Sequence, residues 1–199
     1  MSWAEIGKAI NDTFSKKGRK RALNRIVEDE AYNSFYNFMA TISYMQYQGS
    51  VFDTDVWKVV PYGVEELTSD HIGTDLFDSV VLPNTVKIIK NHTFPSHVRY
   101  VSLPPSLKTI ESYAFIDCKD LANVVLPNRL ETIGQYAFTN CKSLTVISIP
   151  ESVKSIATNA FSGCNNLNDI YVSWSEAETS GAPWGAPNAT VHYNSEVTT

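Results

Sequence analysis

Hydrophobic residues recur along the chain at fixed positions of a repeated unit, L-x-x-V/I-x-L/I-P-x-x-L/V-x-x-I-x-x-x-A-F-x-x-C. Four phenylalanines occupy one position of this unit, at intervals of 21, 23 and 23 residues: Phe94, Phe115, Phe138 and Phe161. Four prolines keep the same intervals: Pro83, Pro104, Pro127 and Pro150. A weaker unit precedes the regular ones, over residues 61–82. Apolar positions repeated in this way predict a solenoid, in which each turn stacks on its neighbours.

One stretch of each unit alternates between apolar and other residues, as in Val124 and Leu126 or Ile147 and Ile149. A two-residue period is typical of a strand, and the proline that follows ends it because proline lacks a backbone donor. The pattern therefore predicts one short strand in each turn of ~23 residues. The repeated phenylalanine, with a small residue before it, predicts an internal stack of rings that fills the solenoid.

This motif resembles the BspA-like class of leucine-rich repeats, over about Val64 to Val172. The resemblance implies a curved right-handed solenoid used for binding, commonly of proteins or cell-surface ligands, and it implies no catalytic residues. The first unit departs from the pattern: Thr93 replaces the small alanine, and Ser96 or His97 stands near the cysteine position. Two residues are also missing before Val98, so the strand register there is the least regular part of the match.

Alternation also determines the outward positions of the predicted strands, which we expect to form any binding face. These positions combine apolar, aromatic and polar residues: Tyr100, Ser102, Asn123, Val125, Val146, Ser148, Asp169 and Tyr171. An apolar and aromatic mixture on the outside of a soluble protein is typical of a contact surface, while single exposed residues are equally normal.

The sequence holds no motif of a catalytic or metal site. The cysteines recur at the repeat interval, whereas zinc sites use short C-x-x-C pairs, so we interpret them as small core residues rather than metal ligands or a redox pair: Cys118, Cys141 and Cys164. The histidines likewise lack ligand spacing: His71, His92, His97 and His192. Because P-loop, dinucleotide, hydrolase and paired-carboxylate motifs are also missing, we expect no enzyme activity, no cofactor and no metal.

Residues 1–50 follow a helical pattern instead, with a short helix predicted near the start and a long one over about 21–48. Their apolar stripes give the expected attachment surface: Trp3, Ile6, Ile10, Phe14, Phe35, Phe38 and Ile42. Three roles are open for this segment: a cap on the solenoid end, a self-association surface that makes a homo-oligomer, or an anchor in a larger assembly. The basic run from Lys16 to Arg21 is interpreted as a solvated connector, with an acidic partner or nucleic acid as the alternative.

The C-terminal residues break the repeat. Trp174, Trp184 and the alternation of Ala189, Val191 and Tyr193 predict a strand-and-loop lid on the last turn. The segments S-W-A-E-I-x-K-A-I-N and P-W-G-A-x-N-A-T-V-H-Y-N, at the two ends, together resemble repeat proteins of bacteriophages and prophages of gut bacteria. This second resemblance covers about 25 residues and implies a virion- or tail-associated protein with its solenoid displayed.

Charge and hydropathy exclude some classes of protein. The net charge of the 199 residues is −5, but residues 1–25 hold seven Lys and Arg against two acidic residues, so the rest carries −10. This balance excludes a uniformly basic nucleic-acid binder. No apolar signal-peptide core is present, and the uncharged residues 31–52 are too polar for a membrane span.

The sequence as a whole predicts an α+β leucine-rich-repeat solenoid, with a helical element over residues 1–50 and the solenoid with its C-terminal cap over residues 51–199. We expect a display module in a virion, with virion proteins or a host surface ligand as its partners. The alternatives are a bacterial BspA-like surface adhesin and a cytoplasmic protein-binding scaffold.

Overall fold

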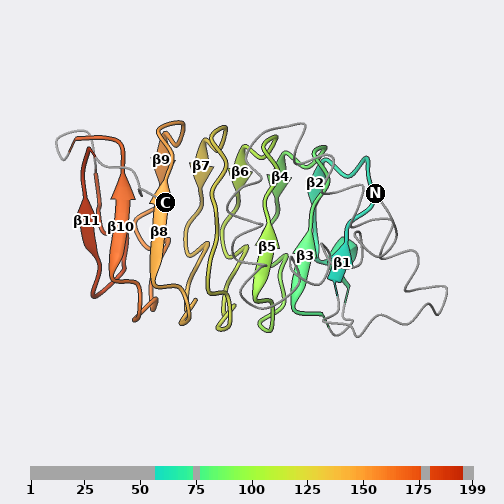
Figure 1. Cartoon of the computed structure of the whole chain (residues 1–199), viewed down its shortest axis with the longest axis horizontal. Helices are drawn as coiled ribbons and strands as arrows, with labels where there is room; N and C mark the ends of the chain where they lie inside the picture. The colour runs from blue at the N-terminus through green and yellow to red at the C-terminus, as the bar shows by residue number, and fades with distance from the viewer. Residues whose placement is uncertain (1–56, 74–76, 176–179, 195–199) are drawn as a thin grey trace, which may run out of the picture.

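The computed structural model describes residues 57–73, 77–175 and 180–194, which form an elongated stack of turns (Figure 1). The predicted N-terminal helices lie outside the described residues, as does the whole expected attachment surface: Trp3, Ile6, Ile10, Phe14, Phe35, Phe38 and Ile42. The register of the described strands confirms the solenoid, because each strand pairs in parallel with strands of neighbouring turns.

The described part contains short strands and one four-residue helix. In chain order they are β1 (Trp57–Val59), β2 (Glu66–Leu67), α4 (Ser69–Ile72), β3 (Ser79–Val81), β4 (Ile88–Ile89), β5 (Tyr100–Ser102), β6 (Thr109–Ile110), β7 (Thr132–Ile133), β8 (Val146–Ile149), β9 (Ser155–Ile156), β10 (Asp169–Val172) and β11 (Thr190–His192). The α+β class is therefore not confirmed in this part of the chain, which is almost entirely β. Nor does it contain a helix long and apolar enough to span a bilayer.

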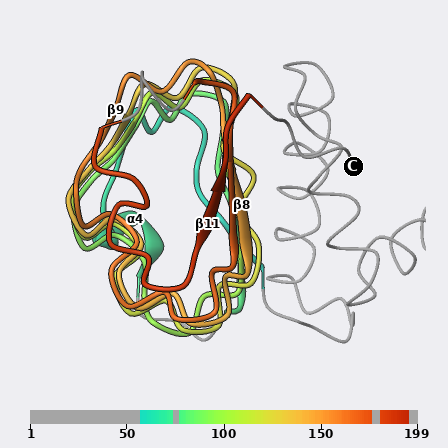
Figure 2. The ribbon, with the colours of Figure 1, turned by 90° about the vertical axis from the view of Figure 1, so that its left-hand side faces the viewer.

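Most turns contribute two strands, so the expectation of one strand per turn is wrong. One face of the solenoid carries the parallel sheets β1-β3-β5 and β8-β10-β11, and the opposite side carries the parallel sheet β2-β4-β6-β7-β9 (Figure 2). The strands of this second sheet are two residues long. Two residues show no period, so the pattern of apolar positions gives no signal for them.

The strand expected around Val124 and Leu126 is reduced to a single bridge, from Tyr100 to Asn123. Val124 and Leu126 are nevertheless buried, like their counterparts in the other turns. Alternation predicts which side chains point inward, whereas a ladder also needs hydrogen bonds between neighbouring turns. The core is therefore continuous where this sheet is interrupted.

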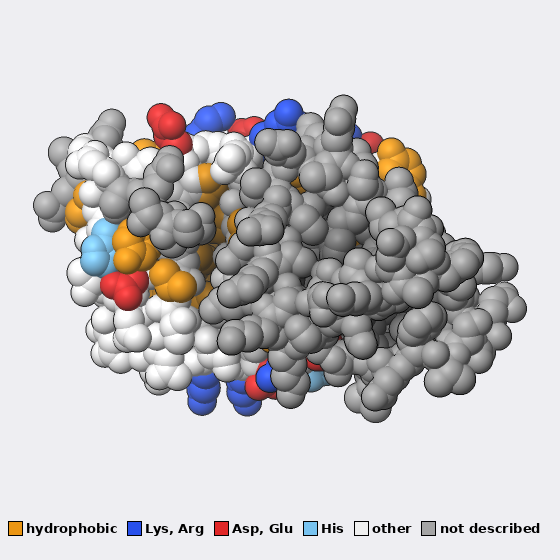
Figure 3. Space-filling model, in the orientation of Figure 1, with side chains coloured by type: hydrophobic (Ala, Val, Ile, Leu, Met, Phe, Trp, Pro, Cys, Tyr) orange, Lys and Arg blue, Asp and Glu red, His pale blue; other side chains and the backbone are white. Residues whose placement is uncertain are grey.

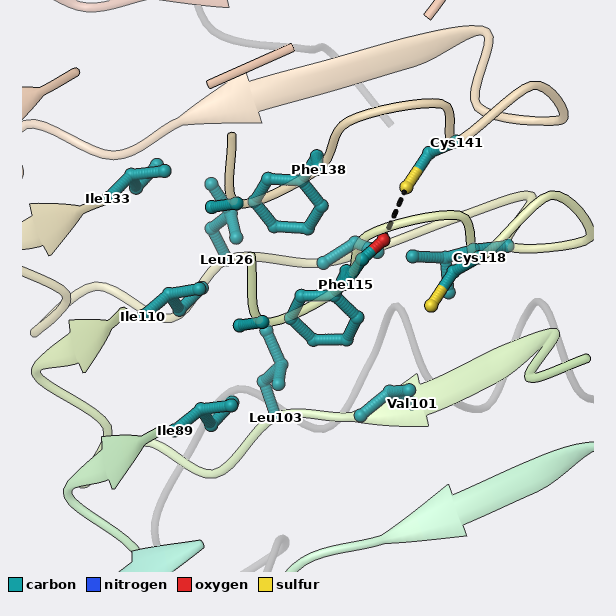
Figure 4. Packing of buried hydrophobic residues seen from close by; sticks show 14 of the residues in the cluster. Ile89, Val101, Leu103, Ile110, Phe115, Cys118, Leu126, Ile133, Phe138 and Cys141 are labelled. Carbon is teal, nitrogen blue, oxygen red and sulfur yellow. Dashed lines mark hydrogen bonds between the residues drawn. The ribbon is translucent and has the colours of Figure 1, made fainter. Parts of the chain in front are cut away.

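The phenylalanine column is confirmed as the centre of the core (Figure 4). Phe115, Phe138 and Phe161 are fully buried, and their rings stack with centroids 4.9 and 5.5 Å apart. The backbone supports this stack, because the Phe138 N–H donates to the carbonyl of Ala160 in the next turn at 2.8 Å. Each ring therefore covers the faces of its neighbours, and the stack runs from turn to turn.

The irregular first unit joins the same column. Phe94 stacks on Phe115 with centroids 4.4 Å apart. Thr93, in place of the small alanine, is buried, and its hydroxyl donates to the Lys90 carbonyl at 2.7 Å, with the Leu67 carbonyl as a second acceptor at 3.1 Å. Since these bonds satisfy the hydroxyl, a threonine fits where the other units have alanine.

The last turn is covered by the segment that ends in β11, as the alternation at residues 189–193 predicts. β11 pairs in parallel with β10, and Trp184 is 2 % exposed. The carbonyl of Trp184 accepts the Phe161 N–H at 3.0 Å, and its indole N–H donates to the Ser180 carbonyl at 3.1 Å. The segment thus extends the backbone ladder past the last regular unit.

Candidate binding face

The outward face consists of the side chains of β1, β3, β5, β8, β10 and β11 that point away from the core. Alternation is regular in β8 and β10, where every second residue is buried and the others are half-buried. Ile147 and Ile170 are at most 1 % exposed and belong to the core, and Val146 and Asp169 lie beside them on the outward face.

The register aligns these outward residues in two rows across the strands. One row holds Val146, Asp169 and Thr190, and the other holds Ser148, Tyr171 and His192. Neighbours in a row are one strand spacing apart, about 4.8 Å. Figure 3 shows hydrophobic side chains beside a histidine and an acidic side chain in this region of the surface.

Asp169, Tyr171 and His192 form a contact cluster at the C-terminal end of the outward face. His192 Nε2 lies 2.7 Å from Asp169 Oδ1, and the imidazole stacks on the Tyr171 ring with centroids 4.5 Å apart and planes 14° apart. The side chains of His192 and Asp169 are 36 % and 43 % exposed. The carboxylate and the tyrosine ring thus hold the imidazole in one orientation while all three side chains remain accessible.

The structure places seven of the eight predicted binding residues at half-buried outward positions: Tyr100, Asn123, Val125, Val146, Ser148, Asp169 and Tyr171. Ser102 is a correction, because it is only 5 % exposed. Alternation determines the side to which Ser102 points, but it does not determine what lies over that side.

His192 is the member of the contact cluster that the sequence analysis missed. The alternation of Ala189, Val191 and Tyr193 predicts the strand, and the residue between two inward positions must point outward. This signal could have placed His192 on the outward face. Its partners Asp169 and Tyr171 depend on the pairing of β11 with β10, which the repeat does not specify because it ends at Val172.

The second sheet is a weaker candidate for binding because its charged residues pair with one another. Lys108 and Lys154 both contact Glu131, at 3.6 and 3.1 Å, and Lys87 contacts Glu65 at 2.9 Å. The hydrogen bond and the charge of Lys154, together with the charge of Lys108, hold the pKa of Glu131 below its usual value. Exposed pairs of this kind contribute little stability individually.

A second aromatic column lies beside the phenylalanine stack. His92, Tyr113 and Tyr136 stack with centroids 5.1 and 5.3 Å apart, and all three have left-handed backbone angles, with φ of 52, 60 and 57°. The Tyr136 hydroxyl accepts a hydrogen bond from Asn159 Nδ2 at 3.1 Å. Because the rings cover each other's faces, this column offers a ligand mainly its edges.

The three cysteines are free, buried and directed at backbone carbonyls of the preceding turns. Cys141 Sγ donates to the Phe115 carbonyl at 3.3 Å (Figure 4), and Cys164 Sγ donates to the Phe138 carbonyl at 2.9 Å. Burial, with a smaller contribution from Asp117, raises the pKa of Cys118 from 9.0 to about 12. The hydrogen-bonded Cys164 thiol and burial raise the pKa of Cys141 as well. Among the described residues, no group of three or more His, Cys, Asp or Glu is arranged to hold a metal ion.

We expect a thiol reagent to label none of these cysteines in the native protein at pH 8, and to label all three in urea. All three native thiols are buried, so the reagent cannot reach them. Thiol reagents attack the thiolate, and the pKa values of Cys118 and Cys141 are raised, whereas the hydrogen bond with Cys141 lowers the pKa of Cys164, so burial alone protects that thiol. An absorbance assay with Ellman's reagent measures both states. Rapid labelling of one thiol without denaturant would contradict the buried column.

The raised pKa of Cys118 also makes the free energy of unfolding depend on pH in alkaline solution. The folded state binds the Cys118 proton more tightly than the unfolded chain does. The protonated thiol therefore contributes its full stabilisation of the folded state below about pH 9, and this stabilisation is lost as the pH rises toward about 12. Urea unfolding at several pH values should show this fall, and Cys118→Ala should flatten it. Equal slopes for the two proteins would contradict the assignment to Cys118.

Comparison with known proteins agrees with this architecture. The family model for the BspA type leucine-rich repeat region matches residues 72–180, as six copies. The structure of a leucine-rich repeat protein from T. pallidum is similar, with 28 % identity and a TM-score of 0.56 over 70 % of this chain and 69 % of that one. No curated protein matches the chain significantly.

Two further solved structures are similar over smaller shares of their own length. One is a leucine-rich cell surface protein from Faecalibacterium prausnitzii, with 27 % identity and a TM-score of 0.54 over 61 % of this chain and 33 % of that one. The other is the pneumococcal vaccine antigen PcpA, whose 19 % identity and TM-score of 0.51, over 70 % and 42 % of the two chains, show a shared fold alone. The repeat motif, the stacked solenoid and the family match together place this chain in the BspA-type leucine-rich repeat family.

Proposed function

We propose that this chain is a non-enzymatic, adhesin-like module that binds a protein partner through the outward face of β8, β10 and β11. The observation that carries the proposal is the contact cluster of Asp169, Tyr171 and His192, in register with the half-buried Val146 and Ser148 on the neighbouring strand. A rigid aromatic pair beside a hydrogen-bonded charge resembles the centre of a protein interface, where aromatic anchors are surrounded by polar groups.

The family supports a binding role, because stacked repeats present one continuous surface made of many turns. The relative from Faecalibacterium prausnitzii is described as a cell surface protein, and we extend that location to this chain as part of the proposal. This chain spans only about a third of that relative.

The test is a binding measurement with a panel of purified extracellular-matrix and cell-surface proteins. We expect Val146→Lys and Tyr171→Lys together to weaken binding to any partner on the panel by at least ~10-fold, because they place charge in the centre of the interface. The matched control is Thr109→Lys with Thr132→Lys, at half-buried outward positions of the second sheet. Binding that survives this double change, or falls equally in the control, would contradict the outward face as the site.

A virion-associated role is the second candidate, and it depends on the two terminal segments that resemble phage repeat proteins. The similar solved structures named above come from bacteria and lend it no support. The neighbouring genes distinguish the candidates: capsid, portal or tail genes favour a virion location, and a secretion locus favours the adhesin. Neighbours of neither kind would favour the cytoplasmic scaffold.

A further inference from the structure

Three residues on the outward face are buried where the repeat geometry leaves them outside. Ser79, Val81 and Ser102 are 0, 0 and 5 % exposed. The register aligns Val81 and Ser102 in one row. Ser148 occupies the same position of the repeat as Ser102, two units later, and is half-buried. The outward face is therefore covered over β3 and at Ser102 of β5, whereas Tyr100 and the outward residues of β8 and β10 are half-buried.

Val81 shows that the cover is not the solenoid core. Its neighbour Val80 belongs to the core cluster, whereas Val81 is fully buried and does not belong to that cluster. Among the described strands and helix, β3 makes its main contacts with the adjacent strands β1 and β5. The helix α4 lies on the far side of the solenoid from β8 and β11 (Figure 2). A fully buried apolar side chain outside the core needs another covering segment.

We propose that residues 1–56 dock on the outward face of β3 and β5 and form an intramolecular cover. This segment joins the chain at Trp57 in β1, which pairs directly with β3, so its end lies beside the covered residues. Its sequence predicts helices with apolar stripes, which supply a surface complementary to Val81. The other undescribed stretches, 74–76, 176–179 and 195–199, are too short to cover two strands, and the last follows β11 at the far end.

Of the three roles that the N-terminal sequence leaves open, an intramolecular cover corresponds to the cap. A segment that caps its own solenoid uses its apolar stripe within one chain, so that stripe is not available for a partner copy or a larger assembly. It also limits the accessible binding face to β8, β10 and β11. The inference stands on the burial of β3 and β5 and does not require the proposed binding function.

A matched pair of cysteine variants in the full chain tests the cover. Ser102→Cys and Ser148→Cys make the same change at the same position of the repeat, two units apart. We expect a maleimide to label S102C at least ~10-fold more slowly than S148C, because labelling of a covered site requires local opening. The three native thiols are buried and serve as an internal check that the chain is folded. Equal labelling rates would overturn the cover.

A second change tests the identity of the cover. Phe35→Asp with Phe38→Asp, added to S102C, should raise its labelling to the rate of S148C while the native thiols remain protected. Protection of S102C that persists would overturn the assignment to residues 1–56. Protection that falls on dilution would show that a second copy covers the face, and would also overturn it.

Photo-crosslinking of the otherwise unchanged chain decides the question if the aspartate variant unfolds. With p-benzoylphenylalanine in place of Tyr100, we expect cross-links to peptides from residues 1–56 of the same chain. The matched control carries p-benzoylphenylalanine at Tyr171, on β10, and should give none. Cross-linked dimers, or cross-links from Tyr100 only to residues beyond 56, would overturn the proposal.

Discussion

Replacement of Phe138 by alanine should lower the free energy of unfolding by about 3–5 kcal/mol. Phe138 is fully buried, and both faces of its ring are covered, by Phe115 with centroids 4.9 Å apart and by Phe161 with centroids 5.5 Å apart. The alanine removes the buried ring and leaves a cavity between two rings whose backbones are tied by hydrogen bonds. The surrounding turns cannot close this space without breaking their ladders.

Urea unfolding followed by circular dichroism measures this loss. Tyr62→Ala is the matched control, because Tyr62 is 72 % exposed and its removal leaves no cavity. We expect the control to remain within about 0.5 kcal/mol of the parent. A loss below about 1 kcal/mol for Phe138→Ala would contradict a tightly packed column.

Replacement of Gly134 by alanine should destabilise the protein by about 1–3 kcal/mol through overpacking. A Cβ at this position would lie 2.5 Å from the backbone nitrogen of Ser112 and 2.7 Å from the carbonyl carbon of Glu111. Both atoms belong to the backbone of the preceding turn, so no side chain can rotate away. The two turns would have to separate, which stretches the hydrogen bond of 2.8 Å from Gly134 N–H to the Ile110 carbonyl.

The equivalent position of the next turn supplies the control. Ala157 makes the corresponding bond to the Ile133 carbonyl, at 3.0 Å, and already carries a Cβ. Ala157→Gly should cost less than about 1 kcal/mol, the ordinary penalty of glycine flexibility. Thermal unfolding of both variants makes the comparison, and a Gly134→Ala protein as stable as the parent would contradict the close contact.

The sequence predicts those parts of the fold in which one residue type marks one position in every turn. Phe115, Phe138 and Phe161 fulfil this condition, and their stack is confirmed. Ile147 and Ile170 are also predicted correctly, because alternation places them on the inner side of β8 and β10. In both cases the physical cause of the pattern is burial, which requires apolar residues at each repeat.

Three features could not be derived in this way. The second sheet depends on strands of two residues, such as β6 and β7, which are too short to show a period. The low exposure of Ser102, 5 %, cannot be derived from alternation, which gives the side to which a residue points and not what lies over that side. The cluster around His192 depends on a pairing beyond the last repeat. The second sheet keeps the repeat interval, as in the pairing of Thr109 with Thr132, but its hydrogen bonds leave no mark on the apolar pattern. The cluster around His192 involves a segment outside the repeat.

The interval of the repeat has an evolutionary consequence. Side-chain contacts join residues that are 23 positions apart, as in Asn140 to Asp117, Asn159 to Tyr136 and His192 to Asp169. Duplication or loss of one whole unit by recombination therefore gives every residue at the junction a counterpart of the expected kind. The encoded protein can gain or lose turns while each turn keeps the same core residues. Length then becomes an inherited variable, and selection can adjust the area of the binding surface one turn at a time.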